Sequence, residues 1–242
     1  MRTIIVLLFI SAVALFVLVP LIVFAWITGL NRVIISAAKI AIRVSQWLAG
    51  INVEAKGLEK VDRKASYVFM ANHLSLIDGP LLFMLIPQPV RVLLKKEAFR
   101  IPVIGQGMSQ VAFVPVDRRG LKGGKRSIEW ATRLMREKEF SFLIFPEGTR
   151  SRDGFLQRFK RGGFFLAINS QRPIVPVSLK GTFEIMPKGS FFMKRGKIRV
   201  VFHEPVPVRG YTKKNLIDLL ERVRNVVRSG LEEERNEVRA YN

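Results

Sequence analysis

The first part of the chain contains a long stretch without any charged side chain. It runs from Thr3 to Ile27, and Leu, Ile, Val, Phe and Ala dominate it. An apolar segment of this length is sufficient to cross a bilayer as a helix. We do not interpret it as a signal peptide, because only Arg2 precedes it and no small-x-small cleavage site follows. A buried core helix is also a poor interpretation of so long an uncharged run. The sequence therefore predicts a membrane as a partner.

Residues 20–50 indicate how the N-terminal part of the chain is arranged in this membrane. Pro20 is expected to kink or break the apolar helix, and a turn is expected at residues 29–31. Residues 33–50 then read as an amphipathic helix, with Lys39 and Arg43 four positions apart on one face. Two arrangements stay open, a single transmembrane helix and a helical hairpin in one leaflet, and these features favour the hairpin. The Lys- and Arg-rich segments beyond it predict that the rest of the chain lies on the cytoplasmic face of the cell membrane.

The charge balance narrows the class of partner. The formal net charge is +21, of which residues 1–50 carry +4 and the remainder +17. Such an excess indicates an anionic partner, which can be a nucleic acid, a membrane surface or a phosphorylated substrate. A nucleic acid leaves the apolar N-terminus unexplained. The absence of cysteine excludes thiolate chemistry, and two histidines without an acidic cluster argue against a zinc site, so we expect no metal.

Residues 51–242 alternate between short apolar runs and helical patterns. Runs rich in branched and aromatic residues predict buried strands at Ser66–Ala71, Val90–Leu94, Val111–Val116, Phe140–Phe145, Ile174–Leu179 and Ile198–Phe202. Helical patterning is present at Lys122–Lys138, Arg161–Ser170 and Lys213–Glu234. The alternation predicts one α/β domain, a mainly buried sheet flanked by helices, after the N-terminal membrane motif.

The first chemical motif is Asn72-His73-Leu74-Ser75-Leu76-Ile77-Asp78, directly after a predicted strand. A histidine at a strand end with a carboxylate nearby is suited to general base catalysis. Residues five apart lie about 140° from each other on a continuous helix. His73 and Asp78 therefore meet only if the chain bends between them, with Asp78 in the first turn of the next helix. The alternative is structural, because Ser75 and Asp78 also have the spacing of a capping box.

The second motif is Phe145-Pro146-Glu147-Gly148-Thr149-Arg150, at the end of another predicted strand. Gly148 allows the backbone to approach a ligand closely. The planar guanidinium of Arg150 suits a phosphate group, and Glu147 would orient it or accept a hydrogen bond from a substrate hydroxyl. The structural alternative is a turn with a surface ion pair.

Other basic residues also follow predicted strands. Arg118 comes after Val116-Asp117, and Lys95 ends the strand that begins at Val90. Ligands of open α/β sheets bind outside the strand ends. We therefore expect these cations to converge on one anionic group.

Taken in order, these blocks resemble the glycerolipid acyltransferase family. They are His73-x4-Asp78, Val116-Asp117-Arg118, Phe145 to Arg150, and Ile174-Val175-Pro176-Val177, and the resemblance covers roughly residues 50–210. The greatest similarity is to bacterial enzymes that acylate 1-acyl-sn-glycerol-3-phosphate (lysophosphatidate). One departure is Pro115 in the second block, where such proteins often have an aliphatic residue.

The resemblance implies a role for each matching residue. His73 and Asp78 would be catalytic, and a phosphate-binding group would comprise Lys95, Arg118, Glu147, Gly148, Thr149 and Arg150. It also implies acyl transfer from acyl carrier protein or coenzyme A to the sn-2 hydroxyl of lysophosphatidate. The thioester would be a co-substrate, and no cofactor is expected.

Alternatives remain at this point. A sister enzyme would use glycerol-3-phosphate or another lysolipid, and a lipid-binding scaffold would keep the membrane motif without catalysis. A serine hydrolase is disfavoured, since Gly107-Met108-Ser109-Gln110-Val111 lacks the final glycine of a nucleophile elbow. We expect His203, at another strand end, to have no catalytic role.

Overall fold

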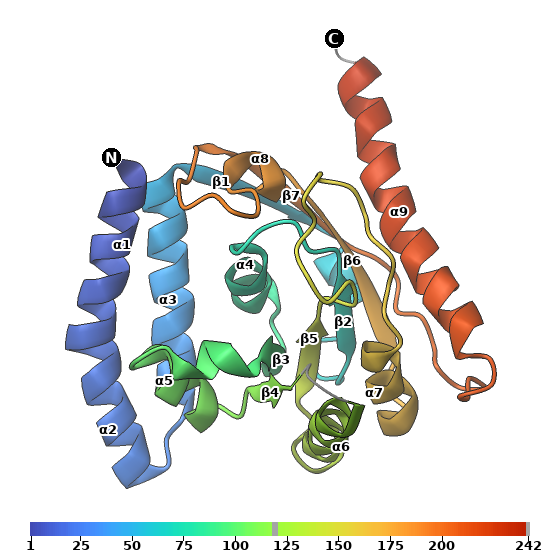
Figure 1. Cartoon of the computed structure of the whole chain (residues 1–242), viewed down its shortest axis with the longest axis horizontal. Coiled ribbons are helices and arrows are strands. Elements are labelled where there is room, and N and C mark those ends of the chain that lie inside the picture. The colour runs from blue at the N-terminus through green and yellow to red at the C-terminus, as the bar shows by residue number, and fades with distance from the viewer. Residues whose placement is uncertain (118–120, 241–242) are drawn as a thin grey trace.

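The computed structural model describes residues 1–117 and 121–240, and a seven-stranded sheet organises it (Figure 1). The strand order is β1-β7-β6-β2-β5-β3-β4. Strand β7 runs antiparallel to β6, and the other neighbouring strands pair in parallel. The strands are β1 (Ile51–Lys56), β2 (Val68–Ala71), β3 (Val90–Lys95), β4 (Val114–Val116), β5 (Ser141–Ile144), β6 (Ile174–Lys180) and β7 (Gly196–Phe202).

Helices precede, connect and follow these strands. They are α1 (Arg2–Val13), α2 (Val19–Thr28), α3 (Arg32–Ala49), α4 (Asp78–Leu85), α5 (Ile104–Gln110), α6 (Leu121–Lys138), α7 (Gly162–Ser170), α8 (Thr182–Ile185) and α9 (Leu216–Ala240). Short 3₁₀ segments occur at Leu58–Lys60 and Lys96–Arg100. The predicted mixed α/β class is confirmed.

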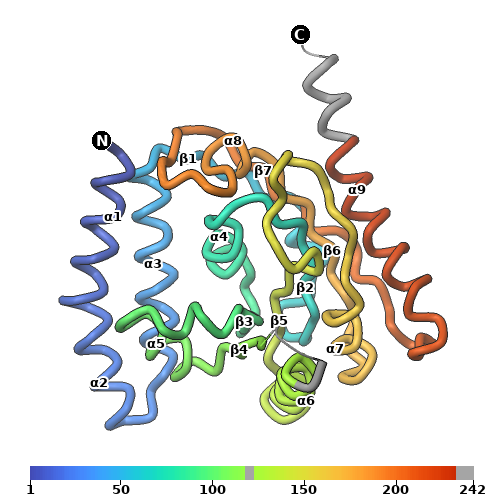
Figure 2. Tube along the Cα trace, viewed as in Figure 1, coloured from blue at the N-terminus to red at the C-terminus, as the bar shows by residue number. Residues whose placement is uncertain are grey.

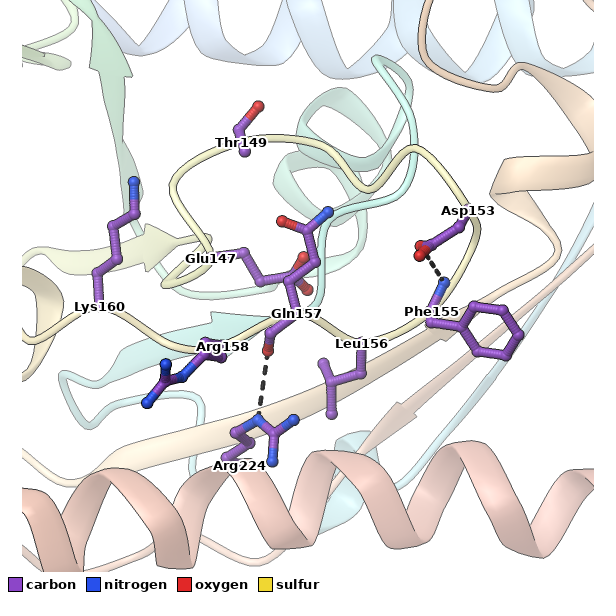
Figure 3. Close-up of a pocket in the computed structure, with 9 residues that line it drawn as sticks. All are labelled: Glu147, Thr149, Asp153, Phe155, Leu156, Gln157, Arg158, Lys160 and Arg224. Atoms are coloured by element: carbon purple, nitrogen blue, oxygen red, sulfur yellow. Dashed lines mark hydrogen bonds between the residues drawn. The ribbon is translucent and has the colours of Figure 1, made fainter.

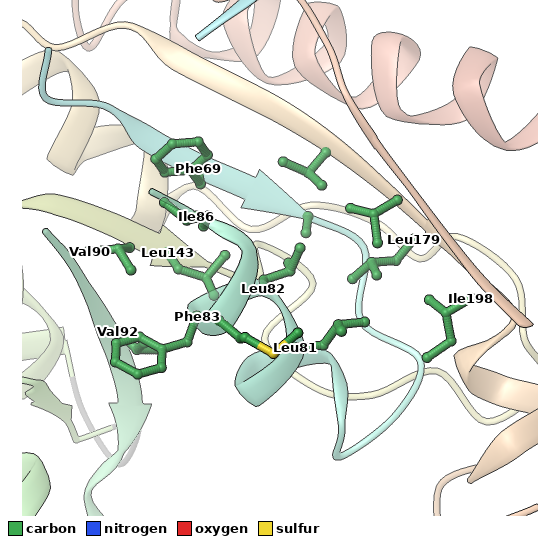
Figure 4. Packing of buried hydrophobic residues seen from close by; sticks show 14 of the residues in the cluster. Phe69, Leu81, Leu82, Phe83, Ile86, Val90, Val92, Leu143, Leu179 and Ile198 are labelled. Carbon is green, nitrogen blue, oxygen red and sulfur yellow. The ribbon is translucent and has the colours of Figure 1, made fainter. Parts of the chain in front are cut away.

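The central strands are apolar on both sides because helices cover both faces of the sheet. In β2, Phe69 and Ala71 point into one cluster of buried side chains, while Val68 and Met70 point into the other. The first cluster packs under α3 and α4. Figure 4 shows the part of it around α4. The second packs under α6, α7 and α9. The sheet is thus the middle layer of three.

The apolar N-terminal segment forms one long helix rather than a broken one. A π-helical turn at Ala14–Leu18 joins α1 to α2, and Pro20 follows as the second residue of α2. The expectation that the helix breaks at Pro20 is wrong. Proline has no N–H to donate and its ring crowds the preceding turn, and the wider π turn just before it accommodates both effects. Residues Arg2–Thr28 are long and apolar enough to cross a membrane.

The chain reverses after this helix and α3 returns along it. Gly29 ends α2 with a φ of +73°, a left-handed conformation that glycine adopts without strain. The continuous helix of residues 2–28, formed by α1 and α2, then lies side by side with α3, and we call these two the helix pair (Figure 1). Much of the outer surface of this helix pair is apolar, and Trp26 and Trp47 are 80% and 76% exposed. How the pair meets a membrane stays a prediction.

The predicted elements differ from the structure at β4, β1 and α5, and the short helix α8 was also not predicted. The strand expected from Val111 begins only at Val114, because Val111 closes α5 and Ala112 has a φ of +60°. Strand β1 was not predicted, because it lacks the continuous apolar run of the buried strands; its alternating polar and apolar residues are typical of a half-exposed edge strand. Helix α5 was not predicted either, because two glycines in seven residues hide its pattern.

Candidate active site

The candidate site lies at the carboxyl edge of the parallel strands. Strands β2, β5 and β3 are neighbours in the sheet and point the same way. His73 follows β2, Glu147 follows β5, and Lys95 ends β3. Neighbouring strands lie about 4.8 Å apart, so the three chain segments leave the sheet within about 10 Å of each other. This edge collects the two motifs as the sequence predicts. Arg118 lies outside the residues that the structure describes.

His73 and Asp78 meet across a bend in the chain. The Nδ1 atom of His73 lies 2.9 Å from Oδ2 of Asp78. Residues 72–77 lie outside regular structure, and Asp78 is the first residue of α4. The expected geometry, with His73 before the helix and Asp78 in its first turn, is therefore what the structure has.

The carboxylate of Asp78 is held rigidly. It is fully buried, and its Oδ2 also accepts hydrogen bonds from the backbone N–H groups of Leu74 and Ser75, both at 2.7 Å. The bond to Ser75 N–H is one half of a capping box. The other half would be a bond from Asp78 N–H to the Ser75 hydroxyl, but this hydroxyl accepts from Ile77 N–H at 3.4 Å instead, and it donates to the carbonyl of Met186 at 2.6 Å. Asp78 thus organises the loop and also contacts the imidazole.

The bond to Asp78 determines which nitrogen of His73 has a free lone pair. An ionised carboxylate only accepts hydrogen bonds, so Nδ1 must carry the proton that it donates. In the neutral ring, Nε2 then has the lone pair and is free to take a proton. The imidazole also stacks on the ring of Phe145, with centroids 4.1 Å apart and planes 20° apart. Contacts on two sides therefore fix its orientation.

Glu147 connects the second motif to the first. Its Oε1 accepts a hydrogen bond from the backbone N–H of His73 at 3.0 Å, and the residue is only 1% exposed. Burial raises the pKa of Glu147 to about 7, against hydrogen bonds from backbone groups that lower it. This side chain faces the backbone of the histidine loop. The sequence did not reveal that, because neither spacing nor residue type shows where a carboxylate points.

This buried carboxyl group predicts a pH-dependent stability. The folded chain keeps the proton of Glu147 up to about pH 7, whereas the unfolded chain loses it near pH 4.5. The folded state therefore binds more protons between these values, and the free energy of unfolding falls by about 3 kcal/mol as the pH rises through them. Glu147→Gln removes this component.

We expect thermal unfolding in detergent to show it. The stability of Glu147→Gln relative to the wild type should increase by about 3 kcal/mol between pH 5 and pH 8. Glu221→Gln, on the exposed surface of α9, is the control and should show no such trend. Parallel pH curves for the wild type and Glu147→Gln would contradict the raised pKa.

The rest of the second motif forms a tight turn with one unpaired cation. Gly148 has a φ of +73°, and an added Cβ would lie 3.0 Å from Nζ of Lys160. Lys188 donates hydrogen bonds to the Thr149 hydroxyl at 3.0 Å and to the Arg150 carbonyl at 3.1 Å. Within residues 1–117 and 121–240, the guanidinium of Arg150 has no hydrogen-bond or salt-bridge partner. It is therefore available to an anion.

The loop that continues from this turn borders an open groove of about 520 Å³ (Figure 3). Figure 2 traces the loop between β5 and α7, and Figure 3 shows Arg224 of α9 on the opposite side of the groove. Three cations line it: Arg158, Lys160 and Arg224. Sequence reasoning missed these residues, because no motif marks a basic side chain that arrives from a distant helix.

The two lysines at the end of β3, Lys95 and Lys96, both have carboxylate partners. Lys95 pairs with Glu97 at 3.7 Å, and Lys96 contacts Asp117 at 2.5 Å, so both lysines already face carboxylates.

A residue that sequence reasoning passed over is Asn72, which is fully buried. Its side chain makes two hydrogen bonds to the backbone of Leu179, at 2.7 and 2.8 Å, and these join the histidine loop to β6.

The other histidine contacts a buried serine in a structural arrangement. The Nε2 atom of His203 lies 2.8 Å from the Ser178 hydroxyl, which donates to the carbonyl of Val227 at 2.9 Å. The serine proton is thus used, and the histidine must donate to the serine rather than activate it. Ser109 donates to the carbonyl of Gly105 within α5. Neither serine is arranged as a nucleophile.

Known acyltransferases are similar to this chain. The Acyltransferase family profile matches residues 52–180. A 1-acyl-sn-glycerol-3-phosphate acyltransferase of Limnanthes douglasii is 34% identical over 74% of this chain and 63% of its own length. One from Borreliella burgdorferi is 30% identical over 74% of this chain and 72% of its own length. The chain spans 58–63% of the length of three plant relatives and 43–44% of two others.

A solved structure has the same fold. The crystal structure of the 1-acyl-sn-glycerophosphate acyltransferase of Thermotoga maritima superposes with a TM-score of 0.82. The two sequences are 24% identical, and the match covers 97% of this chain and 95% of the other. The profile spans more than half of this chain and includes both predicted motifs. The chain therefore belongs to the acyltransferase family.

Proposed function

We propose that the protein is a membrane-bound 1-acyl-sn-glycerol-3-phosphate acyltransferase. It transfers a fatty acyl group from acyl carrier protein or coenzyme A to the sn-2 hydroxyl of lysophosphatidate, and the product is phosphatidate. The names of its relatives support the acceptor, and the bond between His73 Nδ1 and Asp78 Oδ2 carries the mechanism.

In this mechanism His73 is the general base. Its Nε2 takes the proton of the acceptor hydroxyl as the oxygen attacks the thioester carbonyl. The new C–O bond forms, the C–S bond breaks, and the imidazolium returns its proton to the departing thiolate. Asp78 keeps Nδ1 protonated and stabilises the transient positive charge. The thiolate is a good leaving group, so the transfer proceeds without an acyl-enzyme.

Arg150 is the proposed ligand of the acceptor phosphate. Its guanidinium is unpaired within the described part of the chain, three residues after Glu147. The N–H of the next residue, Ser151, donates to the carbonyl of His73 at 2.8 Å. Arg150→Ala is expected to raise the KM for lysophosphatidate roughly 10- to 100-fold with a smaller change in kcat, because a charge-assisted pair is lost. Steady-state kinetics with varied acceptor measures this. Arg152→Ala, an exposed arginine of the same loop, is the matched control, and equal effects of both changes would contradict a specific phosphate contact.

The apolar helix pair supports a location in the membrane. Arg2–Thr28 is long and apolar enough to cross a bilayer, and many of its large apolar side chains are exposed. A lysophosphatidate molecule stays in the bilayer because each buried CH₂ group stabilises it by about 0.8 kcal/mol. We place the protein on the cytoplasmic face of the cell membrane, since its surface is strongly cationic.

The test of this function is a comparison of acceptors. Purified protein in liposomes receives an acyl thioester with either lysophosphatidate or glycerol-3-phosphate, and products are identified by mass spectrometry. Phosphatidate formed from lysophosphatidate, with release of one thiol per acyl group, is the expected result. Transfer to glycerol-3-phosphate alone would keep the mechanism and overturn the acceptor.

A further inference from the structure

Two neighbouring phenylalanines project from the loop that joins α8 to β7. Phe191 is 81% exposed and Phe192 is 75% exposed. Single exposed apolar residues are ordinary on protein surfaces, whereas contiguous exposed apolar surface is typical of interaction sites. These two belong to residues 187–195, which we call the aromatic loop.

The exposure of these rings results from an ordered loop. The Ser190 hydroxyl accepts a bond from Phe192 N–H at 3.0 Å and donates to the Phe192 carbonyl at 3.1 Å. Further along, the N–H of Lys194 donates to the carbonyl of Ile185 at 3.0 Å. The loop is thus closed on itself at its tip and at its base, and it holds both rings outward.

The aromatic loop is bonded to the N-terminal helix pair. The N–H of Met193 donates to the Thr3 hydroxyl in the first turn of α1, at 2.9 Å. Arg2 donates to the carbonyl of Ala49, the last residue of α3, at 3.3 Å. Three segments therefore meet at one end of the molecule, near the N-terminus in Figure 1. Trp47, 76% exposed, is two residues before this end of α3.

The charge around the aromatic loop identifies what it contacts. The loop contains Lys188, Lys194 and Arg195, and no acidic residue occurs between positions 185 and 203. Exposed aromatic rings among cations complement an anionic lipid surface, where the rings enter the interface and the cations meet the headgroups. A second copy of this chain is a poor partner, because its net charge of +21 repels an identical surface.

The aromatic loop and the residue just before it contact both motifs of the candidate site. Met186, just before it, accepts the hydrogen bond of the Ser75 hydroxyl at 2.6 Å. Lys188, within it, bonds to Thr149 and to the carbonyl of Arg150. The position of the loop relative to a membrane therefore determines the position of the candidate site.

We propose that the aromatic loop is a second membrane anchor, which inserts Phe191 and Phe192 into the interface of an anionic bilayer. The apolar helix pair is the first anchor, and the loop holds the acceptor site at the lipid surface. This inference rests on the proposed function insofar as the acceptor is a membrane lipid.

The chain contains no cysteine, so a single introduced cysteine can be labelled specifically. We choose Phe192→Cys in the aromatic loop, Trp26→Cys in α2 and Ile217→Cys in α9, each in the full chain. Their native side chains are 75%, 80% and 44% exposed. Each variant carries an environment-sensitive nitrobenzoxadiazole label and is mixed with vesicles of phosphatidylcholine and phosphatidylglycerol. Blue-shifted emission and quenching by spin-labelled lipid report insertion.

The expected result is insertion of the labels at positions 192 and 26, and none at position 217. Insertion at position 26 without insertion at 192 would overturn the second anchor and leave membrane association through the helix pair intact. No binding to vesicles by any variant would overturn the membrane location as well. Neither outcome depends on acyl transfer, so a failure of the proposed reaction is distinguished by the acceptor assay.

A matched pair of variants tests the contribution of the rings to affinity. Phe191→Ser with Phe192→Ser should weaken partitioning into the anionic vesicles roughly tenfold, because two apolar side chains no longer leave water. Phe191→Leu with Phe192→Leu keeps apolar bulk and should recover most of the loss. Ile217→Ser controls for removal of an exposed apolar side chain elsewhere. Equal partitioning of the serine and leucine pairs would contradict the proposal.

Discussion

Replacing His73 with alanine is expected to lower the kcat of acyl transfer by roughly 10²- to 10⁴-fold, the usual contribution of a positioned general base. Only the imidazole Nε2 is placed to take the acceptor proton in this mechanism, since Nδ1 is bonded to Asp78. Partitioning into lysophosphatidate-containing vesicles should stay unchanged. Initial rates of phosphatidate formation in liposomes, measured with saturating thioester, give the comparison.

The chain has one other histidine, which makes a matched control possible. His203 is hydrogen-bonded to Ser178 between β6 and α9, and His203→Ala should retain wild-type rates once its stability is taken into account. A His73→Ala protein with substantial residual turnover would contradict the assignment of the base. Equal losses in both variants would indicate damage to the fold instead.

The change Asp78→Asn is expected to lower kcat by a similar factor while the histidine loop keeps its shape. The amide oxygen still accepts from the N–H groups of Leu74 and Ser75, but it has no charge to stabilise the imidazolium. The new NH₂ group takes the place of Oδ1, which has no hydrogen-bond partner among the described residues. We therefore also expect a loss of stability of about 1–3 kcal/mol.

Steady-state kinetics and thermal unfolding separate these two effects. The matched control is Asp62→Asn, in which an exposed carboxylate that accepts from Lys64 N–H becomes an amide far from His73. It should keep full activity. If Asp78→Asn lost stability but kept its turnover, Asp78 would have only its structural role at the start of α4.

The strands that support the site were predictable because both of their faces are buried. The apolar runs at Ser66–Ala71, Phe140–Phe145 and Ile174–Leu179 correspond to β2, β5 and β6 in the centre of the sheet. Strand β1 lies at the edge, where one polar residue in two is tolerated, so it lacks a continuous apolar run and has only the alternation of a half-exposed strand. The order of strands was not predictable, because pairing depends on contacts between segments far apart in the chain.

The meeting of His73 and Asp78 was predictable from their spacing and from the bend that it requires. The position of Glu147 under the histidine loop was not, because the hydrogen bond joins residues 74 positions apart. The same applies to Lys188 and to the aromatic loop, whose sequence contains no motif. At Pro20 the general rule for proline predicts a break, but the helix is continuous because the preceding π turn accommodates the proline ring.

The measurement that tests the mechanism most directly is the tautomer of His73 in the resting protein. Nitrogen-15 NMR of the labelled chain in nanodiscs distinguishes a protonated from an unprotonated ring nitrogen, and His203→Ala assigns the two histidines. A neutral His73 with its proton on Nδ1 and a bare Nε2 is the predicted result. A proton on Nε2 with Nδ1 bare would leave no lone pair facing the acceptor, and His73 would not be the base.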